Sequence, residues 1–221
     1  MITFIPMKKL FSYLFPLAQK KYHSKISGAL EINLMDGKKV LDTANSNYSY
    51  GSLQKILHRG LEEINFDDTI QTVLVLGMGG GSIVETIRTK FKSNAFIELV
   101  DIDEEIISIA KNEFELEKYG NLNLILKDAA DYINSTKQKF DVIVIDIFIG
   151  DTVPTQFTEA KFITELSQHI NANGKLIFNT MRNTMSREVF NRITQTLTES
   201  GLRVRVIEKI QITNDLIIGE K

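Results

Sequence analysis

Short apolar runs alternate with amphipathic stretches over most of this chain, and the alternation predicts an α/β fold. The apolar runs have the length of buried strands, and the stretches between them carry apolar residues at helical spacing. The predicted core strands cover residues 73–76, 95–100, 122–126, 140–146 and 175–178. The predicted helices begin after Ser82 and then cover residues 104–114, 130–135, 159–171 and 186–200.

The first sixty residues follow another pattern. Alternating residues on both sides of Asp36-Gly37 predict a β-hairpin over residues 27–42, because Asp-Gly favours a tight hairpin turn. A polar loop over residues 43–49 and a helix over residues 50–60 follow. Apolar residues on one helical face predict a short helix packed on the body before the hairpin: Leu10, Phe11, Leu14 and Phe15.

The strongest functional signal is the glycine-rich segment after the first core strand, which reads G-M-G-G-G-S at residues 77–82. Its glycines allow a tight turn and the close approach of a ligand, and Ser82 is a good helix N-cap. The next strand ends in V-D-I-D, so that Asp101 can accept hydrogen bonds from both hydroxyls of a ribose. Strand, glycine loop, helix, strand and acid in this order predict a Rossmann-like nucleoside-binding unit.

Further acids follow the third and fourth core strands. Ligands of open α/β sheets bind beyond the carboxyl ends of the strands, where Asp128 and Asp146 fall. Asp146 ends an apolar central strand, and a carboxylate there is costly unless it is used. A helix cap is the alternative interpretation of Asp128, Asp103 is interpreted as an N-cap or a solvated acid, and Asp151 belongs to either an active-site loop or a plain turn.

The last two predicted strands, residues 202–209 and 216–219, have no helix between them and must be antiparallel neighbours. Dinucleotide-binding domains continue instead with parallel strands. A dinucleotide-dependent dehydrogenase is also disfavoured because Ser82 occupies the third glycine position of G-x-G-x-x-G. S-adenosylmethionine-dependent transferases typically end in an antiparallel pair.

Composition narrows the class of protein further. With a net charge of −2, the chain has no basic field that would attract nucleic acid or an anionic membrane. The absence of cysteine excludes disulfides, zinc–thiolate sites and cysteine nucleophiles, and it fits a cytoplasmic protein. The three histidines are widely spaced, so no metal is expected. The N-terminal run after Lys8-Lys9 imitates a signal peptide, but we do not expect one, because the apolar run is short and no small-x-small cleavage site follows it. Met7 is an alternative start to Met1.

Four motifs, G-M-G-G-G-S, V-D-I-D, K-D-A-A-D-Y and F-D-V-I-V-I-D, resemble those of class I S-adenosylmethionine-dependent transferases. More narrowly they resemble the spermidine/spermine synthase (polyamine aminopropyltransferase) family, from about Gly28 to Lys221. The resemblance implies a Rossmann-like class I methyltransferase fold, with a mostly parallel seven-stranded sheet, an antiparallel C-terminal strand and a small N-terminal β-hairpin region. Residues 1–60 would hold the N-terminal helix, hairpin and connecting helix, and residues 61–221 the nucleoside-binding transferase domain.

The resemblance also implies roles for single residues. S-adenosylmethionine or its decarboxylated form would be the co-substrate, with the glycines at its amino-acid or aminopropyl end, Asp101 at the ribose, and Asp128 with Ala129 at the adenine. The implied co-substrate residues are Gly77, Gly79, Gly81, Asp101, Ile102, Asp128 and Ala129. The implied catalytic residues, which would orient or deprotonate an attacking amine, are Asp146, Tyr48, Tyr50 and Asp151.

The substrate side departs from the family pattern. Polyamine-making members carry acids in a D-E-F-x-Y-x-E pattern after the hairpin, whereas residues 45–52 here keep the tyrosines and have Ser and Asn in place of the acids. Fewer acids weaken the capture of a polycation. We therefore expect a small-molecule amine as substrate and leave its identity open. Methyl transfer and a non-catalytic nucleoside-binding homologue are the alternatives, and a homodimer through the hairpin is compatible with the sequence.

Overall fold

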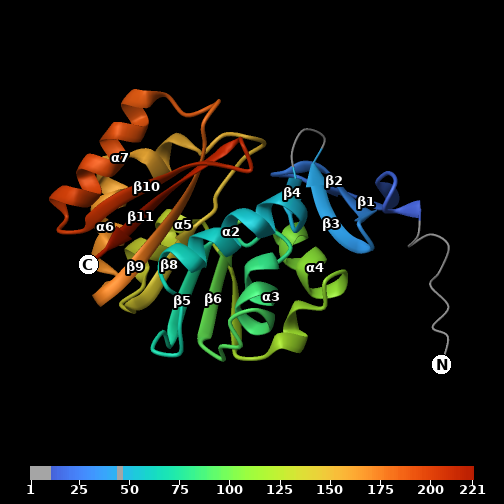
Figure 1. The fold of residues 1–221 in the computed structure, drawn as a ribbon, viewed down its shortest axis with the longest axis horizontal. Helices are drawn as coiled ribbons and strands as arrows, with labels where there is room; N and C mark the ends of the chain where they lie inside the picture. The colour runs from blue at the N-terminus through green and yellow to red at the C-terminus, as the bar shows by residue number, and fades with distance from the viewer. Residues whose placement is uncertain (1–10, 44–46) are drawn as a thin grey trace.

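Two β-sheets organise the molecule (Figure 1). The computed structural model describes residues 11–43 and 47–221, without the side chains of Asn47 and Tyr48. The smaller sheet is antiparallel and contains β1 (Leu17–Ser24), β2 (Gly28–Met35), β3 (Lys38–Thr43) and β4 (Asn47–Ser49), paired in that order. The hairpin predicted around Asp36-Gly37 is confirmed as β2 and β3. Both turn residues have positive φ, 50° and 73°, as a two-residue hairpin turn of this kind requires.

The larger sheet has seven strands. They are β5 (Thr72–Leu76), β6 (Phe96–Asp101), β7 (Leu122–Leu126), β8 (Phe140–Ile145), β9 (Ile170–Met181), β10 (Arg203–Ile210) and β11 (Asn214–Glu220). Their order is β10-β11-β9-β8-β5-β6-β7, and β5 to β9 are mutually parallel. β11 runs antiparallel to both β9 and β10. The predicted mostly parallel seven-stranded sheet with an antiparallel C-terminal strand is confirmed.

Helices cover both faces of this sheet (Figure 1). One apolar cluster joins the strands to α2 (Gly51–Glu63), α3 (Ser82–Thr89) and α4 (Glu104–Asn112). The other joins them to α5 (Ala129–Ser135), α6 (Ala160–Gln168) and α7 (Arg187–Glu199). Successive strand residues alternate between the clusters, since Val73 and Val75 belong to the first and Leu74 and Leu76 to the second. A strand buried on both faces therefore needs an apolar residue at every position.

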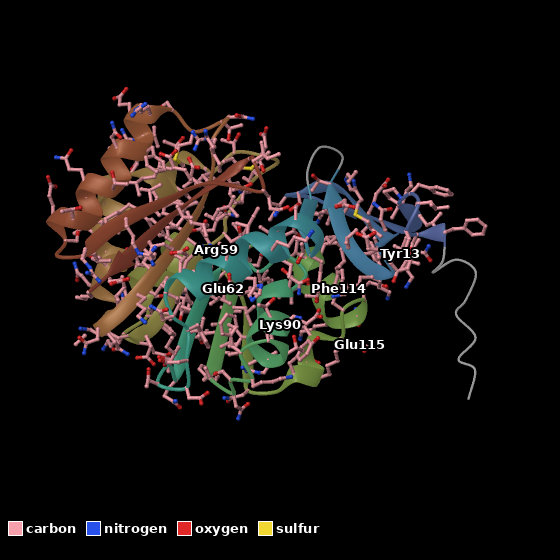
Figure 2. All side chains as sticks on the ribbon, viewed as in Figure 1. Tyr13, Arg59, Glu62, Lys90, Phe114 and Glu115 are labelled. Atoms are coloured by element: carbon pink, nitrogen blue, oxygen red, sulfur yellow. The ribbon has the colours of Figure 1, made fainter. Side chains whose placement is uncertain are left out.

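At the beginning of the described chain, the predicted packing of apolar side chains on the body is wrong. Phe11 is helical and residues 12–15 form a turn and a bend, and the side chains of Phe11, Leu14 and Phe15 are exposed. Tyr13, at 59% exposure, lies at the outer end of the smaller sheet (Figure 2). The helix itself stays a prediction, because Leu10 and the residues before it lie outside the described part. β1 was missed because its edge face is lysine-rich and shows no apolar alternation.

Two boundaries also differ from the prediction. Ser82 is the first residue of α3, and the N-cap is Gly81 in the left-handed region. A Cβ at Gly81 would lie 2.4 Å from Leu116, in the short helix η1 (Leu116–Tyr119), so that glycine is required there. The fifth core strand starts at Ile170, because α6 already ends at Gln168. Among the described residues, no helix has the length and apolarity needed to cross a bilayer.

Acids at both ends of α4 attach the smaller sheet to the body. Asp103 caps the helix by accepting from the Glu105 N–H, and its other oxygen accepts from the hydroxyls of Ser24 and Ser27 at 2.5 and 2.6 Å. Asp103 therefore binds the N-terminal end of α4 and the smaller sheet at once. At the opposite end, the buried carboxylate of Glu113 makes the corresponding attachment.

Glu113 accepts from two strands of the smaller sheet. Its donors are the Lys20 ammonium at 2.5 Å and the Tyr22 hydroxyl at 2.7 Å, both on β1, and the Lys39 ammonium at 3.0 Å on β3. The hydrogen bond from Lys20, followed by those from Tyr22 and Lys39, lowers the pKa of Glu113 to about 2 against the opposing effect of burial. The ionised form of Glu113 thus stabilises the fold at neutral pH.

Replacing Glu113 with Gln should lower the free energy of unfolding by about 1–3 kcal/mol at neutral pH, because charge-assisted hydrogen bonds become neutral ones. The folded pKa lies below the unfolded value, so the difference should narrow as the pH falls below about 4. Denaturant unfolding at several pH values measures this. Glu115→Gln is the matched control, since Glu115 is exposed and pairs only with Lys118 at the surface (Figure 2). Equal losses in both variants would contradict the attachment.

Candidate active site

A cavity of about 410 Å³ opens at the carboxyl ends of the parallel strands, beside the point where the strand order reverses between β5 and β8. Open α/β sheets bind their ligands at this position. The loops after β5, β6, β7 and β8 line one part of the cavity. The β1–β2 turn, α2, the end of β9 and the start of β11 line the rest. Segments that are far apart in the sequence therefore meet around one space.

The glycine loop passes closely against the end of β8. Gly77 has a φ of +82°, and a Cβ there would lie 2.3 Å from the backbone oxygen of Asp146. Gly77 and Gly79, two of the predicted co-substrate residues, line the cavity. Gly81 does not, because it faces Leu116 as the N-cap of α3. Its glycine is required for packing and backbone conformation.

Asp101 connects the glycine loop to the end of β6. One carboxylate oxygen accepts from the Met78 N–H and the other from the Asp103 N–H, each at 3.0 Å. Burial at the cavity wall raises the pKa of Asp101 to about 6, and these hydrogen bonds oppose the rise. The neighbouring Ile102 presents a half-exposed side chain to the same cavity. Asp101 is thus held in place before any ligand binds.

Asp128 caps a helix and also lines the cavity. Its Oδ1 accepts from the N–H groups of Ala130 and Asp131, which makes it the N-cap of α5. Its Oδ2 accepts from the amide of Gln156 at 3.0 Å, and Asp128 and Ala129 both line the cavity. Gln156 was not predicted, because it arrives from a separate short helix, η2 (Thr155–Thr158).

Asp146 follows β8 and faces the centre of the cavity wall. Its N–H donates to the carbonyl of Leu76 at 2.8 Å, and its Oδ1 accepts from the Asn179 amide at 2.8 Å. Burial raises the pKa of Asp146 to about 7; the hydrogen bond from Asn179 opposes this rise, and the nearby charge of Asp101 adds to it. A carboxyl group with this pKa can exchange a proton near neutral pH.

The other predicted catalytic residues are placed differently. Asp151 is exposed in the loop after β8 and lines the cavity, while the Thr184 hydroxyl donates to its backbone oxygen at 2.7 Å. The structure does not bring Tyr50 to the cavity. Tyr50 is the N-cap of α2 and has a φ of 66°. Its ring stacks on that of Phe114, with the ring centroids 4.5 Å apart, and lines a second hollow. The side chain of Tyr48 lies outside the described residues.

Two residues that the sequence analysis missed also line this cavity. Asn179 on β9 and Asn214 on β11 are 0% and 4% exposed, and their amides are hydrogen-bonded to each other at 2.9 Å. The available signal was Asn179 itself, a polar residue that directly follows the apolar run of residues 176–178. Within the described part of the chain, no group of three or more His, Cys, Asp or Glu side chains is arranged to hold a metal ion.

The strand order, glycine loop and cavity define a Rossmann-like fold of the class I methyltransferase type. Spermidine synthase from Thermotoga maritima superposes with a TM-score of 0.67 at 14% identity, over 93% of this chain and 73% of that one. Human methyltransferase-like protein 13, solved in complex with SAH, superposes with a TM-score of 0.57 at 22% identity, over 76% and 80% of the two chains. These likenesses establish the fold.

The family follows from the sequence comparisons. The family model for the spermine/spermidine synthase domain matches residues 53–215, and the chain belongs to this family. A polyamine aminopropyltransferase of Saccharolobus islandicus is 29% identical over 173 residues, which are 75% of this chain and 56% of that protein. One from Neisseria meningitidis is 31% identical over 116 residues, or 52% and 44% of the two chains. The chain thus matches about half the length of these relatives.

Replacing Asp146 with Asn should stabilise the protein at about pH 8 by roughly 3–8 °C in melting temperature. The folded pKa of about 7 lies above the unfolded value, so ionisation of this carboxyl group opposes folding as the pH rises from about 4 through 7. The Asn variant is never charged and keeps an oxygen for Asn179. Thermal melts should therefore converge near pH 4. Asp151→Asn is the control and should have the melting temperature of the parent, because Asp151 is exposed. An unchanged or lower melting temperature for the Asp146 variant at about pH 8 would contradict the raised pKa of Asp146.

Proposed function

We propose that the protein transfers an aminopropyl group from decarboxylated S-adenosylmethionine to a small-molecule amine. The charge of the cavity carries this proposal. Its described lining residues include one lysine, Lys127, and five aspartates: Asp101, Asp103, Asp128, Asp146 and Asp151. The decarboxylated co-substrate has a sulfonium, an ammonium and no carboxylate, whereas the intact form adds a carboxylate that these acids repel. Membership of the family and the names of the curated relatives support the same reaction.

The co-substrate would occupy the part of the cavity between the glycine loop and β7. Gly77 and Gly79 leave room for the aminopropyl end, and Asp101 and Ile102 would contact the ribose. Asp128 and Ala129 would contact the adenine. Asp101 supports this arrangement because its carboxylate oxygens are already oriented by backbone N–H groups.

Asp146 would act as the base of the transfer. The amine nitrogen forms a bond to the propyl carbon attached to the sulfonium sulfur, while the bond between that carbon and sulfur breaks and sulfur leaves with the electron pair as a neutral thioether. A free alkylamine has a pKa of about 10 and must lose a proton before it attacks. Asp146, with a pKa of about 7, can accept that proton at neutral pH. The remaining contribution of the protein is to align the amine with the carbon–sulfur bond. Asp151 lines the same cavity and could help orient the amine.

Methyl transfer from intact S-adenosylmethionine is the second candidate. It is favoured by the superposition on methyltransferases, since both reactions are displacements at a carbon bound to a sulfonium. The acidic cavity argues against it, because the intact co-substrate would place its carboxylate among aspartates.

We propose further that the acceptor carries a single amine on an apolar chain. The part of the cavity wall made by the β1–β2 turn and α2 includes Ile26, Leu53 and Ile56. The sequence contains no Asp or Glu from Thr43 to Leu61. A second ammonium would lose water against this wall without gaining a carboxylate there.

The protein would work in the cytoplasm, in line with its lack of cysteine. A homodimer is supported by the exposed apolar side chains beside the smaller sheet, which are Phe11, Tyr13, Leu14 and Phe15.

Calorimetric titration of the protein with the two forms of S-adenosylmethionine tests the reaction class. We expect the decarboxylated form to bind at least about tenfold more tightly, because it lacks the repelled carboxylate. Tighter binding of the intact form would favour methyl transfer. Binding of neither form would contradict the nucleoside site altogether.

Butylamine and putrescine have the same carbon chain and differ by one amine, so they test the proposed acceptor. With the decarboxylated co-substrate, we expect kcat/KM for butylamine to equal or exceed that for putrescine. Asp146→Asn should lower turnover of either by about 10²–10⁴-fold with little change in co-substrate affinity. A clear preference for putrescine would show that a second ammonium has a partner in the cavity.

A further inference from the structure

A chain of uncharged side chains leads from the surface turn before β11 to the carboxyl group of Asp146. The Thr213 hydroxyl lies 2.7 Å from Oδ1 of Asn214, the Asn214 amide nitrogen 2.9 Å from Oδ1 of Asn179, and the Asn179 amide nitrogen 2.8 Å from Oδ1 of Asp146. Asn179 and Asn214 are buried, and their amide oxygens and nitrogens are therefore costly to leave unpaired.

The direction of this chain follows from its chemistry. An ionised carboxylate only accepts, so Asn179 must turn its NH₂ toward Asp146 and its oxygen toward Asn214. Asn214 must then donate with its own NH₂, which leaves its oxygen to accept from Thr213. Each link fixes the next, and reversing one amide would set two donors or two acceptors against each other. All three bonds donate toward Asp146.

The strand topology is what brings these residues together. In the parallel part of the sheet, only the last residues of a strand reach the cavity. β11 runs antiparallel to β9, so its first residue, Asn214, lies at that same edge, opposite Met181 and close to Asn179. The turn before it holds Lys209, Gln211 and Ile212 at φ values of 59°, 47° and 72°. A positive φ is rare for a β-branched residue such as Ile212, and the hairpin keeps it there.

We propose that Asn179 and Asn214 are positioning residues that hold Asp146 ionised and correctly oriented for the transfer reaction. Asn179 occupies Oδ1 and leaves Oδ2 to the acceptor amine. Because the chain is neutral, it favours the carboxylate without placing a cation beside it, and Asp146 keeps the basicity that proton abstraction needs. The role in transfer rests on the proposed function; the orientation and ionisation of Asp146 do not.

Other charged groups reach the same cavity and must be considered with Asp146. Besides it, they are Asp101, Asp103, Lys127, Asp128 and Asp151. Of these, Asp101 is the carboxylate that acts on Asp146. On the β9–β11 side, Asp215 follows Asn214 but turns away, since its carboxylate accepts from Arg182 at 2.6 Å and from the Lys209 N–H at 2.8 Å. From that side, the hydrogen bond to Asp146 comes from an uncharged amide.

Carboxyl-carbon NMR titration of the ligand-free protein tests this without any activity measurement, with the Asp146 signal identified from its absence in Asp146→Asn. In Asn179→Leu, which removes the donor, we expect the pKa of Asp146 to rise by about one unit or more. Asn214→Leu leaves the hydrogen bond to Asp146 in place but removes the partner of the Asn179 amide oxygen, so we expect a smaller rise in the pKa of Asp146. The acid limb of the kcat/KM profile should move upward by the same amounts.

Asn123→Leu is the matched control. It also removes an amide that donates to a carboxylate, Glu98, but on β7 and away from this chain of bonds. We expect no change in the pKa of Asp146 there. Circular dichroism establishes that each variant is folded. An unchanged Asp146 pKa in folded Asn214→Leu would overturn the proposal. A rise in a protein that transfers no aminopropyl group would uphold the orientation and ionisation of Asp146 by Asn179 and Asn214, and it would refute the proposed function alone.

Discussion

The close passage of the glycine loop against β8 is the constraint on which the site depends. β5 lies between β6 and β8, and just beyond its end the Gly77 N–H donates to Val100 while the Asp146 N–H donates to Leu76. No Cβ fits at Gly77, since it would overlap the backbone of Asp146. The absence of a side chain at this single position lets the ends of three strands converge. Asp101 at the end of β6 and Asp146 at the end of β8 consequently share one cavity.

This convergence has an electrostatic cost that the fold bears in advance. Asp101 and Asp146 both have raised pKa values because the cavity wall removes them from water, and Asp146 also feels the charge of Asp101. Backbone N–H groups and an amide offset part of the cost without neutralising either acid. A cationic ligand would supply the missing counter-charge. Such a ligand would stabilise the two carboxylates together, and the cavity would then favour cations over neutral nucleosides.

The sequence was sufficient for features that one local pattern encodes. The apolar runs located the parallel strands, and the acids that end them located Asp101 and Asp146. β1 was missed because an edge strand with Lys20 and Lys21 shows no apolar alternation. Tyr50 was assigned by position, whereas its backbone conformation turns the ring toward Phe114. Asn179 and Asn214 could not be paired from sequence, because their contact arises only when β11 returns antiparallel along β9.

The hairpin turn before β11 combines backbone strain with a well-defined position for the residue that follows it. A turn of glycines at Lys209, Gln211 and Ile212 would adopt the same path without strain, but it would also sample many others. Bulky residues held at positive φ leave the turn few conformations, so the position of the Asn214 side-chain amide after the turn varies little. The backbone strain of the turn therefore accompanies a better defined position for Asn214 at the cavity.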